Sequence, residues 1–179
     1  MTPRQHNTAI APLPVGFSHR IVIAVLIAGA SACSSSTGPS AQGSPLAITR
    51  LRSEPFSLTY TSGLREPQRL VVRDATAWQQ LWTSVWRGVL PEPSLPQVDF
   101  GREMVVLAAM GERPTGGFTI LIDSASEGTS GISIRIRSIS PGSGCGTTQA
   151  LTQPVDIARM PRRDGSVTFD ERLETQECR

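Results

Sequence analysis

One uninterrupted apolar run constrains the fold of this chain more than any other feature. Residues 104–110 read MVVLAAM, with Glu103 before the run and Gly111 after it. An apolar run of strand length without a polar interruption is typical of a strand that is covered on both faces. We therefore expect a central strand here, packed on each side by other apolar elements.

A helical pattern precedes this strand in residues 76–88, TAWQQLWTSVWRG. The large apolar side chains recur at i, i+3, i+4, i+7 and i+8, which is one face of a helix: Trp78, Leu81, Trp82, Val85 and Trp86. Thr76 and Gln79 predict a capping box at its start, and Gly88 predicts its end. Aliphatic residues share the tryptophan face, which favours packing onto a sheet over a sugar-binding or base-stacking platform.

Residues 131–140, GISIRIRSIS, alternate between apolar and polar side chains, which is typical of a half-buried strand. Arg135 and Arg137 fall on its solvent face. Further strands are expected, between Pro and Gly breaks, at 47–52, 56–61, 68–73, 118–123, 155–160 and 166–170. The elements predict an α+β fold: a mainly antiparallel, sandwich-like sheet system with one Trp-rich amphipathic helix. Residues 46–179 have the length of a single domain.

The N-terminal residues predict export. Arg20 precedes an apolar run of about twelve residues, which is too short to span a bilayer and typical of a signal peptide over 1–32. Ala30, Ser31 and Ala32 fit either a signal-peptidase site that releases a soluble protein, or a bacterial lipobox that leaves Cys33 lipidated. The Ser/Gly/Pro-rich tract that ends at residue 45 reads as a tether and favours the lipid anchor.

We therefore expect a lipoprotein of the cell envelope, at the outer membrane or cell surface, attached through an N-terminal lipid. A soluble periplasmic or secreted protein is the main alternative, and a form retained in the cytosol is another. If Cys33 carries lipid, Cys145 and Cys178 remain as an even pair, which predicts a disulfide in an oxidising compartment. The alternative is two unrelated thiols.

The composition of the mature chain limits the catalytic mechanisms and metal sites that it can form. His6 and His19 are the only histidines, both lie in the expected signal peptide, and the chain has no lysine. Triads with histidine, Ser-Lys pairs and Schiff bases are then excluded, and imidazole ligands for zinc are missing. Carboxylates remain, but they are scattered. We expect no enzyme, cofactor or metal, and the balanced charge of the mature chain predicts no nucleic-acid partner.

The segment MGERPTGGFTI at 110–120 begins like a phosphate-binding loop, GxxxxGK[ST]. Gly117 occupies the position of the required lysine, and Phe118 that of the Ser or Thr. Phe118 also begins an alternating strand, so no helix N-terminus is offered to a phosphate. The segment is interpreted as a Pro/Gly turn between two strands, without a nucleotide.

A longer pattern surrounds this turn. VDFGREMVVLAAMGERPTGGFTI, followed by a strand and then by PGSGCGTTQALTQPVDIARMPR, resembles the PrcB C-terminal domain family over about residues 68–163. Its most recognisable parts are residues 111–118 and the TQP-type strand at 152–159. The resemblance implies an accessory module that stabilises a bacterial surface protease complex, often as an exported lipoprotein, without defined catalytic residues.

The expected function is accordingly a binding or assembly module with a protein partner, a protease among the candidates. The residues expected to contact the partner lie in the turn and on the strand expected at 131–140: Arg113, Pro114, Thr115, Gly116, Gly117, Phe118, Arg135 and Arg137. The turn is also similar to the NPTTG[FY] loop of chagasin-type cysteine protease inhibitors, matching it at Pro114, Thr115, Gly117 and Phe118. A protease inhibitor is therefore the alternative function.

Overall fold

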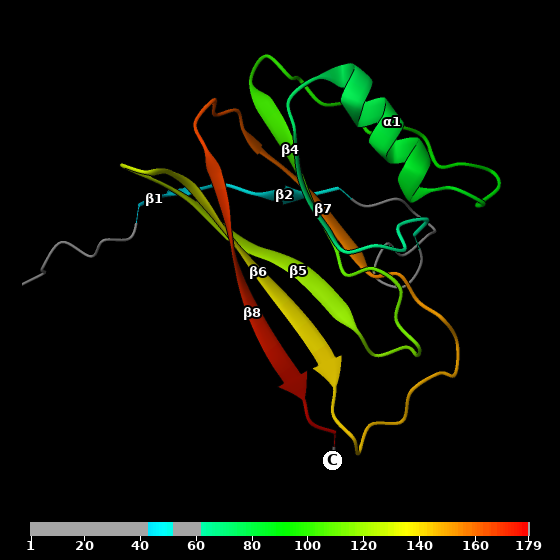
Figure 1. Ribbon diagram of the computed structural model, residues 1–179. Helices are drawn as coiled ribbons and strands as arrows, with labels where there is room; N and C mark the ends of the chain where they lie inside the picture. The colour runs from blue at the N-terminus through cyan, green and yellow to red at the C-terminus, as the bar shows by residue number, and fades with distance from the viewer. Residues whose placement is uncertain (1–42, 52–61, 179) are drawn as a thin grey trace, which may run out of the picture. The chain divides into compact units, whose positions relative to one another are not determined.

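The computed structural model describes residues 43–51 and 62–178, and both ranges belong to one compact unit. Its elements, drawn in Figure 1, are β1 (Ser44–Leu46), β2 (Thr49–Arg50), β3 (Gln68–Val72), α1 (Ala75–Val85), β4 (Glu103–Ala109), β5 (Thr119–Gly128), β6 (Gly131–Pro141), β7 (Val155–Pro161) and β8 (Val167–Gln176). The predicted α+β fold with one helix is confirmed. The strand expected at 56–61 lies outside the described residues.

The strands form two four-stranded sheets. Sheet A has the order β1-β5-β6-β8, and sheet B has the order β2-β7-β4-β3. All pairs are antiparallel except β6 with β8, which run parallel. The single strand expected at 47–52 is wrong: β1 pairs with sheet A, and β2, a few residues later, pairs with sheet B. The chain leaves one sheet for the other within that segment.

Sheet B is the middle layer, as the apolar run predicts. Val105 and Leu107 of β4 belong to the apolar cluster that includes the helix, whereas Met104 and Val106 belong to the cluster between the two sheets. All four side chains have an exposed fraction of 0%. Because successive side chains of a strand point to opposite faces, one strand contributes to both cores.

Helix α1 covers the face of sheet B that points away from sheet A. Trp78 and Trp82 are almost fully buried, and their indole N–H groups donate to the carbonyls of Pro96 and Pro93 at 3.0 and 2.9 Å. The predicted Thr76 cap is wrong. Asp74 is the N-cap and accepts from the Ala77 N–H, since an aspartate in extended backbone caps better than a threonine.

The outer face of sheet A, defined by the β6 side chains that point away from sheet B, is the polar face predicted from the sequence. Ile134 and Ile136 of β6 are fully buried against sheet B, which places Arg135 and Arg137 on the outer face. Neither apolar cluster of the described residues includes a side chain from this outer face. No helix in the described ranges is long and apolar enough to cross a membrane.

Strand β8 is longer than predicted and forms an edge of sheet A. The sequence predicts a strand that ends at residue 170, but β8 continues to Gln176 and pairs with β6 over its whole length. Residues 170–178 are all exposed. An edge strand with no buried face in this half shows no apolar alternation, which is why the pattern misses it.

Candidate partner-binding surface

The turn Arg113–Phe118 connects β4 to β5 and is paired to a second loop. The backbone N–H of Arg113 donates to the Thr152 carbonyl at 2.8 Å, and the Thr152 N–H donates back to the Arg113 carbonyl at 3.0 Å. The Thr152 hydroxyl also donates to the Thr115 carbonyl at 2.8 Å. The turn is thereby fixed by side-chain and backbone bonds to the loop of residues 147–153.

Glycine is needed at two positions of the turn. Gly117 has a φ of 88°, a conformation that L-residues with a Cβ rarely adopt. Gly116 is buried, its N–H donates to the Thr148 carbonyl at 2.9 Å, and a Cβ placed there would lie 2.3 Å from the Thr148 Oγ1. The two loops approach each other too closely for a side chain at this point.

We expect Gly116→Ala to lower the free energy of unfolding by about 1–2 kcal/mol, because the added methyl group overpacks this contact. In a Thr148→Ala background the same change has a much smaller effect, since the hydroxyl that it meets is gone. Equilibrium urea unfolding of the four proteins measures this coupling. Gly146→Ala is the matched control, as a Cβ there meets nothing within 4 Å. Equal losses with and without Thr148 would contradict the close approach.

Only part of the turn faces solvent. Pro114 and Gly117 are exposed, whereas Arg113, Thr115 and Phe118 are half-buried. The Arg113 guanidinium donates to the Met110 carbonyl at 2.9 Å and lies 5.7 Å from the centre of the Phe118 ring. The turn residues therefore mainly stabilise the local conformation, and they expose only a small surface to a partner.

Arg135 and Arg137 lie together on the outer face of sheet A. The Arg137 guanidinium contacts Asp123 on β5 at 3.0 Å and Glu174 on β8 at 3.3 Å, so this ion-pair group crosses three adjacent strands. Arg135 contacts Asp170 at 3.5 Å. These side chains are 34–55% exposed, and ion pairs at this exposure contribute little to stability. These charged side chains can exchange their present ion pairs for ion pairs with a partner.

A shallow groove continues this surface at one end of the outer face. It has a volume of about 430 Å³, and Arg135 and Pro45 lie in its wall. Small hydroxyl side chains of β5, β6 and β8 contribute to its lining: Ser124, Ser126, Ser133 and Thr168. These residues could not be predicted as a group from the sequence, because scattered serines form no motif and only the sheet topology brings them together from three strands.

A buried carboxylate links the two sheets and was also missed. Asp156 of β7, 9% exposed, accepts from the Ile122 N–H of β5 at 2.7 Å and from the Arg50 Nε at 3.1 Å. Arg50 in turn donates to the Ile122 carbonyl at 2.8 Å. The β5–β6 register shifts at this point, so the two side chains satisfy backbone groups at a strand irregularity. Asp156 therefore has a structural role.

At the opposite edge of the sandwich, an ion pair closes the gap between β3 and β8. The Arg69 guanidinium donates to Glu171 at 2.7 Å and to the Ala109 carbonyl at 2.6 Å, and the Ser138 hydroxyl donates to the same carboxylate. Partial burial raises the pKa of Glu171, but the hydrogen bonds from Ser138 and Arg69 and the charges of Arg69 and Arg113 outweigh it. The net effect lowers the pKa.

This shift predicts a pH dependence. A carboxyl group whose pKa is lower in the folded state stabilises the fold above its unfolded pKa, and this stabilisation is lost as the pH falls through the folded pKa. We expect Glu171→Gln to lower the urea midpoint at pH 7, and we expect this difference to shrink progressively as the pH falls below the ordinary carboxyl pKa and through the lower pKa of the folded state. The effect is small, because the Glu171 side chain is 35% exposed. An equal loss at all pH values would contradict the ionised Glu171–Arg69 pair.

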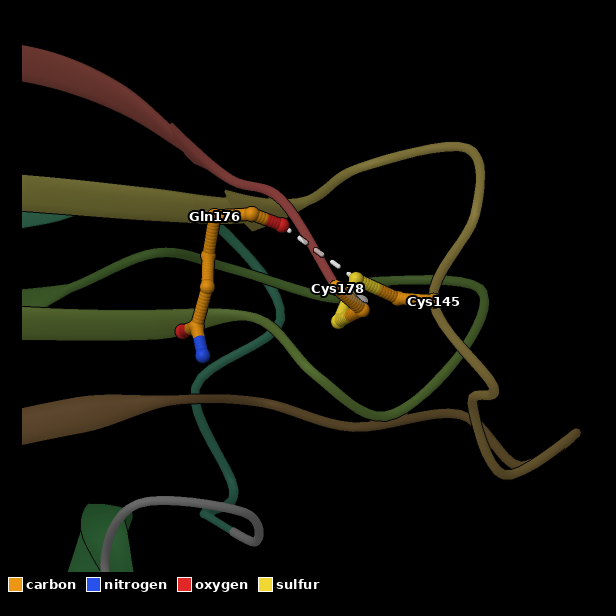
Figure 2. Close-up of a disulfide and its surroundings, with 3 residues drawn as sticks. All are labelled: Cys145, Gln176 and Cys178. Carbon is orange, nitrogen blue, oxygen red and sulfur yellow. Dashed lines mark hydrogen bonds between the residues drawn. A yellow bond between two sulfur atoms is a disulfide. The ribbon is translucent and has the colours of Figure 1, made fainter.

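The disulfide predicted from the cysteine count is present. Cys145 and Cys178 are joined with a Cα–Cα distance of 5.0 Å, and the Cys145 Sγ lies 3.2 Å from the Gln176 carbonyl (Figure 2). The bond ties the loop after β6 to the end of β8. Cys33 lies outside the described residues. The described ranges contain no group of three or more His, Cys, Asp or Glu side chains that could hold a metal ion.

Comparison with known proteins finds a family similarity in the central part of this fold. No curated protein and no solved structure matches the chain. Residues 104–161 match the family model described as PrcB C-terminal. The match runs from β4 through β7, and thus includes the turn, both arginines of the outer face and Asp156. Over these residues, the chain is similar to the PrcB C-terminal family.

Proposed function

We propose that this chain is an exported, lipid-anchored and non-catalytic module that binds and stabilises a protein complex of the cell envelope, with a protease complex as the partner. The observation that carries the proposal is the family match over residues 104–161, since the family takes its name from an accessory subunit. Cys33 is the proposed lipid attachment site. The proposed locations are the outer membrane or the cell surface.

The outer face of sheet A is the proposed contact surface. It carries exposed ion pairs around Arg135 and Arg137 and an adjacent hydroxyl-lined groove. Charged and hydroxyl side chains of this kind suit a polar protein surface, where ion pairs give specificity and orientation more than affinity. The turn Arg113–Phe118 is a second proposed contact through its exposed Pro114 and Gly117.

Chemical crosslinking in the intact envelope, followed by mass spectrometry of the adduct, tests the proposal. The expected adduct contains a protease or a subunit bound to one. Arg135→Gln/Arg137→Gln is expected to reduce its yield severalfold, and Arg113→Ala/Thr115→Ala tests the turn separately. Arg102→Gln is the matched control, because that side chain is 88% exposed and lies on the segment before β4.

Each part of the proposal can fail on its own. If no protease adduct is found, the assembly role is contradicted. If all variants give equal adduct yields, the proposed contact surface is contradicted. Inhibition of a papain-like protease by the purified chain would favour the inhibitor alternative, and hydrolysis of peptides or glycans would contradict the non-catalytic role. The intact mass of the membrane-extracted protein measures lipidation: a mass without acyl chains contradicts the anchor at Cys33.

A further inference from the structure

The free edge of β8 is a second surface that the proposed function does not use. Within residues 43–51 and 62–178, β8 is the last strand of sheet A and pairs with β6 on one side only. In Figure 1 it is the red strand at the edge of its sheet. Natural edge strands are usually protected from further pairing by shortness, bulges, proline or charged side chains. β8 carries charged side chains at residues 170–172 and 174, but Val167–Gln176 contains no proline and its register with β6 is continuous.

The hydrogen bonds to β6 determine which backbone groups point to this edge. The Ile132 N–H donates to the Ser166 carbonyl at 2.9 Å, and the Gly142 N–H donates to the Gln176 carbonyl at 2.8 Å. In a parallel ladder, alternate residues direct both backbone groups to the same neighbour. The even-numbered residues of β8 therefore bond β6. The odd-numbered residues, Leu173 among them, direct their N–H and C=O groups to the open edge.

Two side chains near the middle of the strand lack neighbours. Leu173 is 82% exposed, although apolar. Arg172 makes no ion pair within the described residues, while the arginines beside it on β6 each have an acidic partner. A further strand at this edge would cover the leucine and could supply a carboxylate to the arginine.

We propose that two copies of this chain associate through their β8 edges, paired antiparallel about a two-fold axis at Leu173. Only odd-numbered residues direct backbone groups to the open edge, so odd-numbered residues of one copy must pair with odd-numbered residues of the other. The two-fold axis therefore passes through a single residue, which faces the same residue of the second copy. Centring on Asp170, Glu171 or Arg172 would place like charges opposite each other, which destabilises a strand pair. Centring on Leu173 places Leu173 against Leu173 and Arg172 opposite Glu174 of the second copy.

This register agrees with both features of the free edge. Leu173 loses its exposure to water, and Arg172 gains Glu174 of the second copy, a carboxylate that also contacts Arg137 of its own chain. The two outer faces then lie on the same side of one extended sheet. The dimer would therefore present two copies of the outer face side by side. The dimer proposal does not depend on the proposed function.

Crosslinking through a new cysteine tests the register. The full chain with Cys33→Ser serves as the parent, so that Leu173→Cys adds the only unpaired thiol. Mild oxidation is expected to convert most of this variant to a disulfide-linked dimer on a non-reducing gel, since facing residues of an antiparallel pair are within disulfide range. Asp170→Cys is the control and is expected to form no disulfide-linked dimer on the same gel, because in this register it faces Gln176 of the second copy. The reverse pattern overturns the register.

Charge reversal tests the interface in solution by light scattering after size exclusion. The parent is expected at the mass of a dimer, and Arg172→Glu is expected to raise its dissociation constant roughly tenfold, equivalent to about 1.4 kcal/mol. Arg172→Glu/Glu174→Arg restores the pair and is expected to recover the dimer. A parent that stays monomeric at about 100 μM, or a dimer that Leu173→Arg leaves intact, overturns the proposal. Circular dichroism confirms that each variant folds.

Discussion

Removing the disulfide, as Cys145→Ser/Cys178→Ser, is expected to lower the free energy of unfolding by about 3.5–4 kcal/mol. The two cysteines are 33 residues apart, and in the chain-entropy model a closed loop of this length restricts the unfolded chain by that amount. The folded state is affected locally as well, because the bond holds the loop after β6 against the end of β8. Equilibrium unfolding in urea, followed by tryptophan fluorescence, measures the change.

Fluorescence is a suitable probe, since the three tryptophans lie buried on or directly after helix α1, away from the disulfide. The parent protein under reducing conditions is the control and is expected to match the double variant. An unchanged midpoint in both would show that the two cysteines do not crosslink the chain in solution.

Asp156→Ala is expected to cost about 2–4 kcal/mol. The substitution leaves the Ile122 N–H without its acceptor and Arg50 without its carboxylate, and buried groups that lose a partner carry the full desolvation penalty. Arg50 is 34% exposed and can recover some hydration, which keeps the loss below that of a fully buried pair. The urea midpoint should fall without a large change in slope.

Two matched variants separate the causes. Asp156→Asn keeps an acceptor for Ile122 but removes the charge, so a smaller loss is expected than for alanine. Asp170→Ala removes an exposed aspartate whose ion pair with Arg135 is long, and its effect is expected within about 0.5 kcal/mol. If Asp156→Ala were as mild as Asp170→Ala, the link between the sheets would not stabilise the fold.

Local periodicity predicts the parts of this fold in which one element packs against another. The apolar run of β4, the alternation of β6 and the apolar stripe of α1 each require a face to be covered, and the structure covers them as predicted. The N-cap was wrong only by the choice between two nearby polar residues, Asp74 and Thr76.

Long-range pairings could not be read from the sequence. Asp156 meets Ile122 across 34 residues, and Arg69 meets Glu171 across 102. Nothing local distinguishes these charges from solvated ones, because their partners come from other strands. The outer half of β8 is missed for a related reason: an edge strand exposed on both faces has the composition of a tail. Of the proposed contact residues, the arginines of the outer face follow from alternation, whereas the groove beside them follows from topology.

The parallel pairing of β6 with β8 has a consequence for how the chain reaches its fold. β6 can pair with β5 as soon as their hairpin exists, but its other edge is covered only when β8 has been made. The Cys145–Cys178 disulfide and the Glu171–Arg69 ion pair can form only after that strand is in place. A variant cut short before Val167 would leave the β6 edge open to pairing with other chains.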